Sequence, residues 1–214
     1  MKMFVAAFLM IVMLIFCASS HAEKPKKGFL HGPYLTLEMG AIQMDYDTDQ
    51  VSGEKIGRDF EPAFGFLFGW NLNDNFSPEI QGKYATNFKS GRRLHVASAN
   101  VYAKYTFIID PLVDFKTLRI LPFLKAGMAF RVAVLPGNRN ATKNTITQMG
   151  WGPSPGGGIA FLWKKYFLFG IDLQGDLLIM NDIRQTVNGV PGTLVYQGGF
   201  HPAMSAMAIL GVHY

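Results

Sequence analysis

Two serine–histidine combinations are the residues whose types and spacing come nearest to a nucleophilic site. A serine nucleophile needs a histidine within hydrogen-bond reach and a carboxylate behind that histidine. His201 and Ser205 share one alternation phase, but four residues of extended strand separate them by roughly 13 Å. His95 and Ser98 would face opposite sides of a strand. Neither pair forms a dyad along its own strand, so we predict no catalytic residues, while a pairing between strands stays open.

Charged residues on the polar phase of the chain are the second group with chemical potential. They have two interpretations: a structural network of salt bridges that fills a barrel lumen, or the lining of a narrow polar pore. A closed barrel of eight strands leaves an interior just filled by side chains, which favours the network. The seven residues are Glu79, Lys83, Lys104, Lys125, Arg131, Asp172 and Asp176.

Metal and cofactor sites find little support in the sequence. The histidines after residue 22 are scattered, and no carboxylate cluster has ligand spacing. Asp45, Asp47 and Asp49 alternate in one segment, which we interpret as a solvated acidic loop. Arg139 and Lys143 lie in a later loop and have two interpretations: contacts with the phosphate groups of lipids, or ordinary exposed basic residues. We predict neither a metal nor a cofactor.

The elements that position these residues follow from a two-residue period. Between Phe60 and Leu72, apolar residues occupy nearly every second position, and the positions between them hold small or polar residues apart from Leu67. A strand sends alternate side chains to opposite faces, so this segment is predicted to be a strand with one apolar face. The sequence Asn73–Asp74–Asn75 is a turn signal, and a second alternating segment follows it. Together they predict a hairpin.

The same period recurs along the chain and predicts eight strands in one all-β domain. The first strand is irregular because Ile42 and Met44 fall on the polar phase; a bulge or a partly apolar interior would explain this. We expect strands near residues 34–46, 60–72, 76–88, 100–107, 118–134, 151–163, 167–177 and 205–214.

The N-terminal segment has the features of an export signal. A short basic start precedes an unbroken apolar run over residues 4–16, and small residues follow it as far as Ala22. A membrane-spanning helix needs about 20 apolar residues, and this run is shorter. We therefore predict a signal peptide at 1–22, cleaved after Ala22, and a barrel domain at 23–214. Cys17 is the single cysteine and lies inside the signal, so the mature domain would contain no disulfide.

Composition limits the classes of function. The formal net charge of +5 is a mild excess, and we expect no nucleic-acid partner. Charged residues make up 16% of the chain and hydrophobic residues 49%, whereas about a quarter of an average protein is charged. After residue 22 there is no apolar stretch long enough for a membrane helix. The apolar residues of the mature domain must therefore be accommodated by something other than a membrane-spanning helix.

Three features favour a barrel whose apolar face is outside and covered by lipid, over a soluble barrel with an apolar interior. The apolar phase is almost free of charge, and a charge facing lipid costs about 2–4 kcal/mol at mid-membrane. Aromatic residues lie near strand ends on that phase. Short connections after Leu72 and Trp163 alternate with long ones, of which Leu135–Gly150 and Asn181–Gly198 are the longest. Lipid tolerates no open strand edge, so we predict an eight-stranded antiparallel up-and-down transmembrane β-barrel.

Several strand segments carry a family resemblance. They are Phe64–Trp70, Pro122–Phe130, Gly156–Phe161 and the ending Leu210–Tyr214. The chain resembles the small outer-membrane β-barrel family that includes the membrane domain of outer membrane protein A and the OmpX and Ail proteins. The resemblance implies integral placement in the outer membrane of a Gram-negative bacterium. It implies no single function, because this fold serves structural anchors and adhesins alike.

The resemblance also implies partners. In the family, a terminal aromatic residue preceded by apolar residues at alternate positions is the signal that the barrel-assembly machinery recognises. Leu210, Val212 and Tyr214 match this assembly signal. We expect contacts with outer-membrane lipid and lipopolysaccharide, an extracellular ligand at the loops, and a monomeric state.

The function that we predict is a structural or surface-interaction role, adhesin-like, through the external loops. Loops on a rigid scaffold usually carry recognition. Two alternatives stay open: an enzyme that modifies outer-membrane lipid, and a narrow porin-like pore for small solutes.

Overall fold

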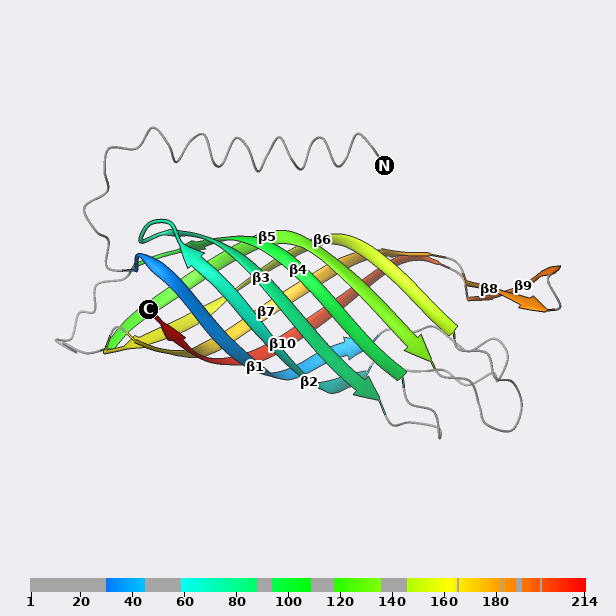
Figure 1. Ribbon diagram of the computed structural model, residues 1–214, viewed down its shortest axis with the longest axis horizontal. Helices are drawn as coiled ribbons and strands as arrows, with labels where there is room; N and C mark the ends of the chain where they lie inside the picture. Colours follow the sequence, from blue (N-terminus) through cyan, green and yellow to red (C-terminus); the bar gives the residue numbers. More distant parts are fainter. Residues whose placement is uncertain are drawn as a thin grey trace, which may run out of the picture.

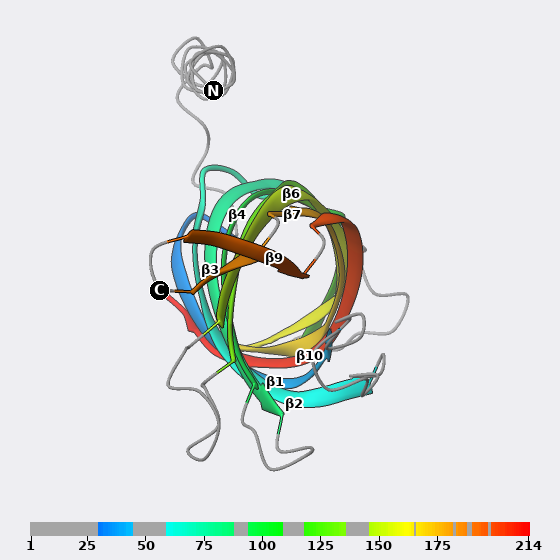
Figure 2. The ribbon, with the colours of Figure 1, turned by 90° about the vertical axis from the view of Figure 1, so that its right-hand side faces the viewer.

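Eight strands close into one antiparallel barrel in the computed structural model of the protein (Figure 1, Figure 2). The order around the wall is β1-β10-β7-β6-β5-β4-β3-β2, so the last barrel strand pairs with the first. The structure describes residues 30–44, 59–87, 94–108, 118–135, 146–164, 166–181, 183–187, 190–196 and 198–214. The barrel strands are β1 (Gly32–Met44), β2 (Asp59–Asn71), β3 (Phe76–Asn87), β4 (Leu94–Thr106), β5 (Leu118–Leu135), β6 (Ile146–Trp163), β7 (Phe167–Met180) and β10 (Gly199–His213).

Alternating side chains define the two faces of the wall. Phe64 and Phe66 of β2 point outward with 59% and 56% of their surface exposed, whereas Leu67 beside them is buried. Among the described barrel strands, the outward phase contains no Asp, Glu, Lys or Arg. The predicted eight-stranded barrel, apolar outside and polar inside, is confirmed. In the described part of the chain, there is also no helical segment with the length and hydropathy of a membrane span.

The irregular first strand has a partly apolar interior and no bulge. The pairing of β1 with β2 runs without a register shift from Gly32 to Met44. Ile42 therefore points inward, where it is buried in an apolar cluster with Val96 and Met207. Of the two explanations that the sequence left open, the apolar interior is the one observed.

Short turns gather at one end of the barrel, which we call the turn end. Asn73 Oδ1 accepts hydrogen bonds from the backbone nitrogens of Asn75 (2.9 Å) and Phe76 (2.8 Å), which fixes the predicted turn between β2 and β3. Lys164 adopts the left-handed conformation (φ 51°) in the short turn between β6 and β7. The backbone nitrogen of Leu30 donates to Asp74 Oδ1 (2.8 Å), so the chain entering β1 is attached to this end.

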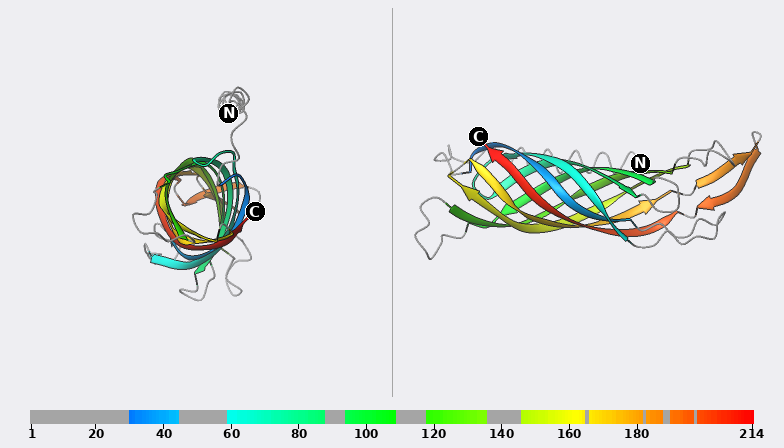
Figure 3. Two further views of the ribbon diagram at one scale, coloured as in Figure 1. Left: turned by 90° about the vertical axis from the view of Figure 1, so that its left-hand side faces the viewer. Right: turned by 90° about the horizontal axis from the view of Figure 1, so that it is seen from below.

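The opposite end, the loop end, differs from the sequence prediction in two places. Residues 146–150 belong to β6 and pair with the end of β5, so the predicted loop Leu135–Gly150 shortens to residues 136–145. The predicted loop Asn181–Gly198 contains a separate hairpin of β8 (Ile183–Val187) and β9 (Val190–Tyr196). The hairpin extends beyond the end of the barrel (Figure 1, Figure 3).

Two tryptophans on the outward phase of β6 mark a membrane-sized interval. Trp151 and Trp163 are 12 residues apart (163 − 151). At about 3.3 Å per residue and a strand tilt of about 40°, this interval covers about 30 Å along the barrel axis. That matches a hydrocarbon core of about 30 Å. Since β6 continues from Trp151 to Ile146, its loop end would extend past the interface of a membrane of this thickness.

Prolines occupy ladder ends at most places in the wall. The β2–β3 ladder stops at Ala63 and Gly69, and Pro62 and Pro78 lie directly beyond those limits. The β4–β5 ladder stops at Phe123, next to Pro122. A proline has no N–H to donate, so a ladder end accommodates it. The exceptions are Pro153 and Pro155 of β6, which face a gap within the β6–β7 ladder, and Pro202 of β10, which is paired inside the β10–β7 ladder.

Candidate functional site

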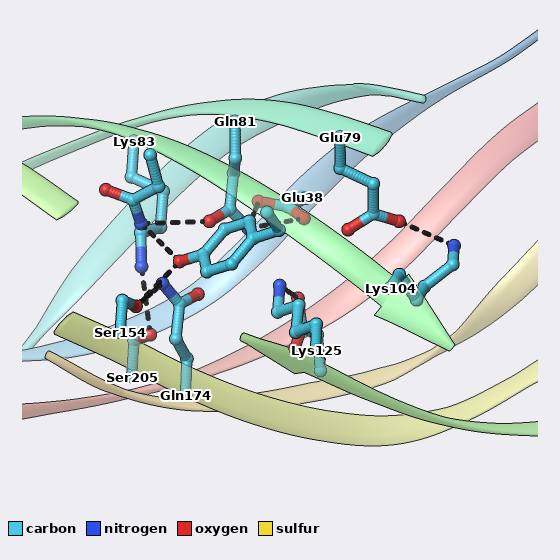
Figure 4. Close-up of polar contacts among 12 residues, drawn as sticks. Glu38, Glu79, Gln81, Lys83, Lys104, Lys125, Ser154, Gln174 and Ser205 are labelled. Carbon is cyan, nitrogen blue, oxygen red and sulfur yellow. Dashed lines mark hydrogen bonds and ion pairs between the residues drawn. The ribbon is translucent and has the colours of Figure 1, made fainter. Parts of the chain in front are cut away.

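The centre of the barrel contains a belt of polar side chains, and we treat it as the candidate site (Figure 4). All seven charged residues that the sequence assigned to the polar phase point into it. They are Glu79 and Lys83 of β3, Lys104 of β4, Lys125 and Arg131 of β5, and Asp172 and Asp176 of β7. Six are buried, and the Lys104 side chain is 12% exposed. The two-residue period is sufficient to place every one of them.

Six of these seven residues form three ion pairs. Lys104 Nζ lies 2.5 Å from Glu79 Oε1, and Arg131 Nη2 lies 2.8 Å from Asp176 Oδ2. Lys125 pairs with Asp172 through its Oδ2. Lys83, the seventh, donates instead to Ser205 Oγ across the lumen (3.1 Å).

Glu38 of β1 is a member of the belt that our sequence prediction omitted. It is buried, and both its carboxylate oxygens accept hydrogen bonds from Gln81 Nε2 (2.9 and 2.8 Å). With Glu38, the belt holds four acids and four cations, so its formal charges balance. Glu38 shares a phase with Tyr34 and Thr36, which are buried too. The signal was therefore in the alternation of β1, hidden by the irregular end of that strand.

Hydrogen bonds link the belt into one path across the lumen. Gln81 accepts from Asn100 Nδ2 (3.2 Å), and Asn100 Nδ2 donates to Tyr102 Oη (2.6 Å). Tyr102 Oη lies 2.9 Å from Ser154 Oγ, and Ser154 donates to Asp176 Oδ1 (2.6 Å). The path runs from β1 through β3, β4 and β6 to β7. Side chains thus cross-link the wall through its interior, which stiffens the barrel.

A cavity of about 40 Å³ lies between this belt and the turn end. Three buried oxygens that have no hydrogen-bond partner belong to residues lining it: Thr36 Oγ1, Glu79 Oε2 and Asp172 Oδ1. A buried water needs about 10–15 Å³ of such volume and two to four polar partners. The cavity therefore has room for about three waters, which would supply the missing hydrogen bonds.

Apolar clusters lie on both sides of the polar belt. At the turn end, the cluster includes Leu30, Leu121 and Leu168; toward the loop end, two clusters include Val96 and Leu178. A second cavity, lined by Arg131 and His201 among others, has about 10 Å³. The interior is thus layered, with apolar, polar and apolar levels. Side chains fill most of its cross-section, as expected for an eight-stranded barrel.

The serine and histidine candidates do not meet in the described structure. His95 Nδ1 lies 2.5 Å from Tyr84 Oη on the outward face. Ser98 Oγ is buried inside the barrel with no hydrogen-bond partner there. Ser205 accepts from Lys83, and His201 lines the small cavity toward the loop end. No hydrogen bond joins a serine to a histidine among the described residues.

The remaining predicted residues divide into two groups. Leu210, Val212 and Tyr214 lie on the outward phase of the closing strand and its end, with Leu210 and Tyr214 largely exposed. Their role in assembly stays a prediction. The signal cleavage after Ala22, Asp45 with its neighbours, and the basic residues of loop 136–145 lie outside the described residues. Within the described part of the chain, no three potential ligands from His, Cys, Asp and Glu come together to hold a metal ion.

Comparison with known proteins identifies the fold. The sequence matches no protein-family model and no curated protein. Three solved structures share the architecture. The N-terminal β-barrel domain of Pseudomonas aeruginosa OprF is 16% identical, covers 86% of this chain and 98% of its own, and has a TM-score of 0.51. Neisserial surface protein A is 11% identical, with coverages of 86% and 97% and a TM-score of 0.57. Yersinia pestis Ail, in complex with the heparin analogue sucrose octasulfate, is 11% identical, with coverages of 86% and 99% and a TM-score of 0.51.

These structures establish that the chain has the fold of the small eight-stranded outer-membrane β-barrels. At such identities, the likeness shows the fold, and function has to be argued from the residues of this chain.

Proposed function

We propose that this protein is an integral outer-membrane barrel that acts as a surface-interaction protein, with its binding surface at the loop end. The observation that carries the proposal is the filled interior: three ion pairs and a hydrogen-bond path occupy the lumen of the described barrel. Passage of a solute would require these buried pairs to separate, which is unfavourable. No observation favours an enzyme, because a serine–histidine pair is not assembled among the described residues.

Orientation follows from the connections. In outer-membrane barrels, short turns face the periplasm and longer loops face the outside. The turn end has the short connections at residues 72–75 and 164–166, whereas the loop end has the hairpin β8–β9. We therefore assign the hairpin to the cell exterior, where a projecting element is available to a partner.

An anionic polymer is the ligand class that two of the loop-end connections favour. The connections 88–93 and 136–145 contain five cations and no acid: Lys89, Arg92, Arg93, Arg139 and Lys143. Both connections leave the barrel at its loop end. Clustered cations attract sulfated or phosphorylated sugars, as in a host glycan or in lipopolysaccharide. The complex of Ail with a heparin analogue supports testing a sulfated sugar first.

The test is binding by the whole barrel in lipid nanodiscs. Changing the five loop cations to glutamine should abolish binding to heparin in solution, and wild-type binding should weaken with salt because exposed charges are screened. Lipopolysaccharide vesicles, used in parallel, distinguish the two sources of the anion. A control variant changes Asp45, Asp47 and Asp49 to asparagine and should bind at least as well as wild type.

Deletion of residues 183–196 removes the hairpin β8–β9 and tests whether the barrel inserts without it. The deleted protein should still insert and show heat-modifiable gel mobility, because β8 and β9 pair with each other and not with the barrel wall. If neither anion binds wild type, or if the glutamine variant binds unchanged, the anionic-polymer proposal is wrong.

A further inference from the structure

Three buried oxygens around the turn-end cavity have no hydrogen-bond partner, and they come from three different strands. They are Thr36 Oγ1 of β1, Glu79 Oε2 of β3 and Asp172 Oδ1 of β7. All three residues line the cavity of about 40 Å³, and each is only 2% exposed. One small cavity therefore gathers two carboxylate oxygens and one hydroxyl oxygen that no other group of the described protein binds.

Both carboxylates are held in place through their other oxygen. Glu79 Oε1 lies 2.5 Å from Lys104 Nζ and accepts a hydrogen bond from the Tyr34 hydroxyl. Asp172 Oδ2 accepts a hydrogen bond from Lys125 Nζ. Because each carboxylate is buried and anchored at one oxygen, its free oxygen keeps a fixed direction. The two free oxygens are thus preorganised for an added positive group.

The belt is neutral as a whole, but the wall of the cavity is not. Its charged lining residues are two acids, Glu79 and Asp172, and one lysine, Lys104, which leaves one excess negative charge when His213 is counted as neutral. Lys83 lies on the far side of the belt from Glu79 and Lys104 (Figure 4). Leucine, isoleucine and phenylalanine side chains form much of the remaining wall. In such surroundings charge is screened poorly, so the cavity attracts a cation.

The size and the oxygen ligands of the cavity select the kind of cation. Hard cations take oxygen ligands such as carboxylates, hydroxyls and water. The cavity has room for about three waters, and one ion of the size of Na⁺ with about two waters needs the same space. An excess of one negative charge matches a monovalent ion. Among the described residues, no third ligand from His, Cys, Asp or Glu joins the two acids to hold a transition metal.

The loop side of the belt lacks this capacity. Asp176 has both oxygens bonded, one to Arg131 and the other to Ser154. The cavity beside Arg131 has only about 10 Å³, and the unpartnered group that this residue contributes is the donor Nε. A cation on the loop side would meet a positive charge and no free carboxylate oxygen, so the loop side provides a control for the turn-end cavity.

We propose that the turn-end cavity binds one monovalent alkali cation of the size of Na⁺. Glu79 Oε2 and Asp172 Oδ1 bind the ion directly, and the Thr36 hydroxyl and about two waters complete its coordination. The ion takes the place of one of the three waters and joins β3 to β7 across the lumen. The proposal requires only the folded barrel and is independent of ligand binding at the loop end.

The test is ²³Na magnetic resonance of the whole barrel in micelles of an uncharged maltoside detergent. Sodium chloride is titrated at constant ionic strength against N-methylglucamine chloride, whose cation is too large for a cavity of about 40 Å³. Bound sodium tumbles with the barrel and relaxes faster. Wild type should therefore broaden the sodium line in a saturable way that fits one site, beyond the effect of micelles alone.

Two double variants separate the cavity from the belt in general. Lys125→Met/Asp172→Leu removes a ligand oxygen without changing the net charge, and it should weaken sodium binding at least about tenfold. The matched control, Arg131→Met/Asp176→Leu, makes the same kind of change on the loop side and should bind sodium as wild type does. Heat-modifiable gel mobility shows that each variant has folded.

A gain of binding gives a third test that damage to the fold cannot imitate. Lys104→Met removes the positive charge beside Glu79, and it should strengthen sodium binding about tenfold. Absence of saturable broadening in wild type means that water alone fills the cavity and overturns the proposal. Equal weakening in the two double variants also contradicts it, and displacement of sodium by Ca²⁺ at lower concentrations than by K⁺ would show a divalent site instead.

Discussion

Two carboxylates at opposite sides of the polar belt are satisfied in different ways. Asp176, on the loop side, has both oxygens bonded, one to Arg131 and the other to Ser154 and Gln174. Glu79, on the turn side, has one oxygen bonded to Lys104 and Tyr34, while its second oxygen has no protein partner and its residue lines the 40 Å³ cavity. The loop side is packed more tightly, with a cavity of about 10 Å³ beside Arg131, whereas the cavity of about 40 Å³ gives the turn side more room for water.

The difference shows how this barrel tolerates eight charges in its centre. Where side chains exclude water, the protein itself must provide each hydrogen bond, because an unpaired buried charge is costly. Where a cavity remains, water completes the coordination. Removal of an ion-pair partner should therefore change the free energy of unfolding by different amounts on the two sides of the belt.

The largest changes in stability should come from removing the cation that pairs with Asp176 or with Glu79. Arg131→Met removes the ion-pair partner of Asp176 in a packed environment and should lower the free energy of unfolding by about 3–5 kcal/mol. Lys104→Met should cost clearly less, because the Lys104 side chain is partly exposed and the cavity beside Glu79 admits water. Urea unfolding in lipid vesicles measures both. Equal losses would contradict the division into a packed and a hydrated side.

The Lys125–Asp172 ion pair should show strong energetic coupling between its two residues. Lys125→Met and Asp172→Leu each leave a buried charge, whereas the double variant leaves none. A double-mutant cycle should return a coupling energy of about 0.5–3 kcal/mol. Simple additivity of the two changes would mean that water in the cavity beside Asp172 already screens this pair.

Removal of two hydroxyl groups, one on each side of the belt, should give the smallest changes in stability. Ser154→Ala removes a donor to Asp176 and an acceptor for Gln174, and it should cost about 1–3 kcal/mol. Thr36→Val removes an oxygen with no protein partner, and it should change stability by less than about 0.5 kcal/mol. A cost for Thr36→Val comparable to that of Ser154→Ala would show that the cavity waters are held as tightly as protein groups.

Alternation accounts for most of what the sequence could predict. It placed the strands, the outward aromatic residues and seven of the eight belt charges, because side-chain direction in a strand depends on parity alone. Alternation alone could not predict that Lys104 pairs with Glu79, or that a hydrogen-bond path runs from Asn100 to Ser154. Those contacts depend on the register and stagger of strands around the closed barrel, which no single segment encodes.

Two features of the structure run against expectations from the local sequence. Pro153 and Pro155 argue against a central strand by composition, yet alternation predicted a strand over residues 151–163, and β6 does run through both prolines, paired with β5 on one side. The hairpin β8–β9 lay within a segment that we expected to be a loop, since the sequence from Asn181 to Gly198 combines strand-forming and turn-forming residues without a long alternating run.

The pairing of β1 with β10 sets a condition on how the molecule is made. Tyr34 lies opposite His213, so closure of the barrel joins residues from the two ends of the domain. Until β10 arrives, β1 and β7 each present an unpaired strand edge, a form that lipid does not accept and that aggregates readily in water. The chain therefore gains little from folding as it emerges from the ribosome. It has to be kept unfolded until its final residues are delivered, and the outward aromatic side chain of Tyr214 is part of the piece that completes the wall.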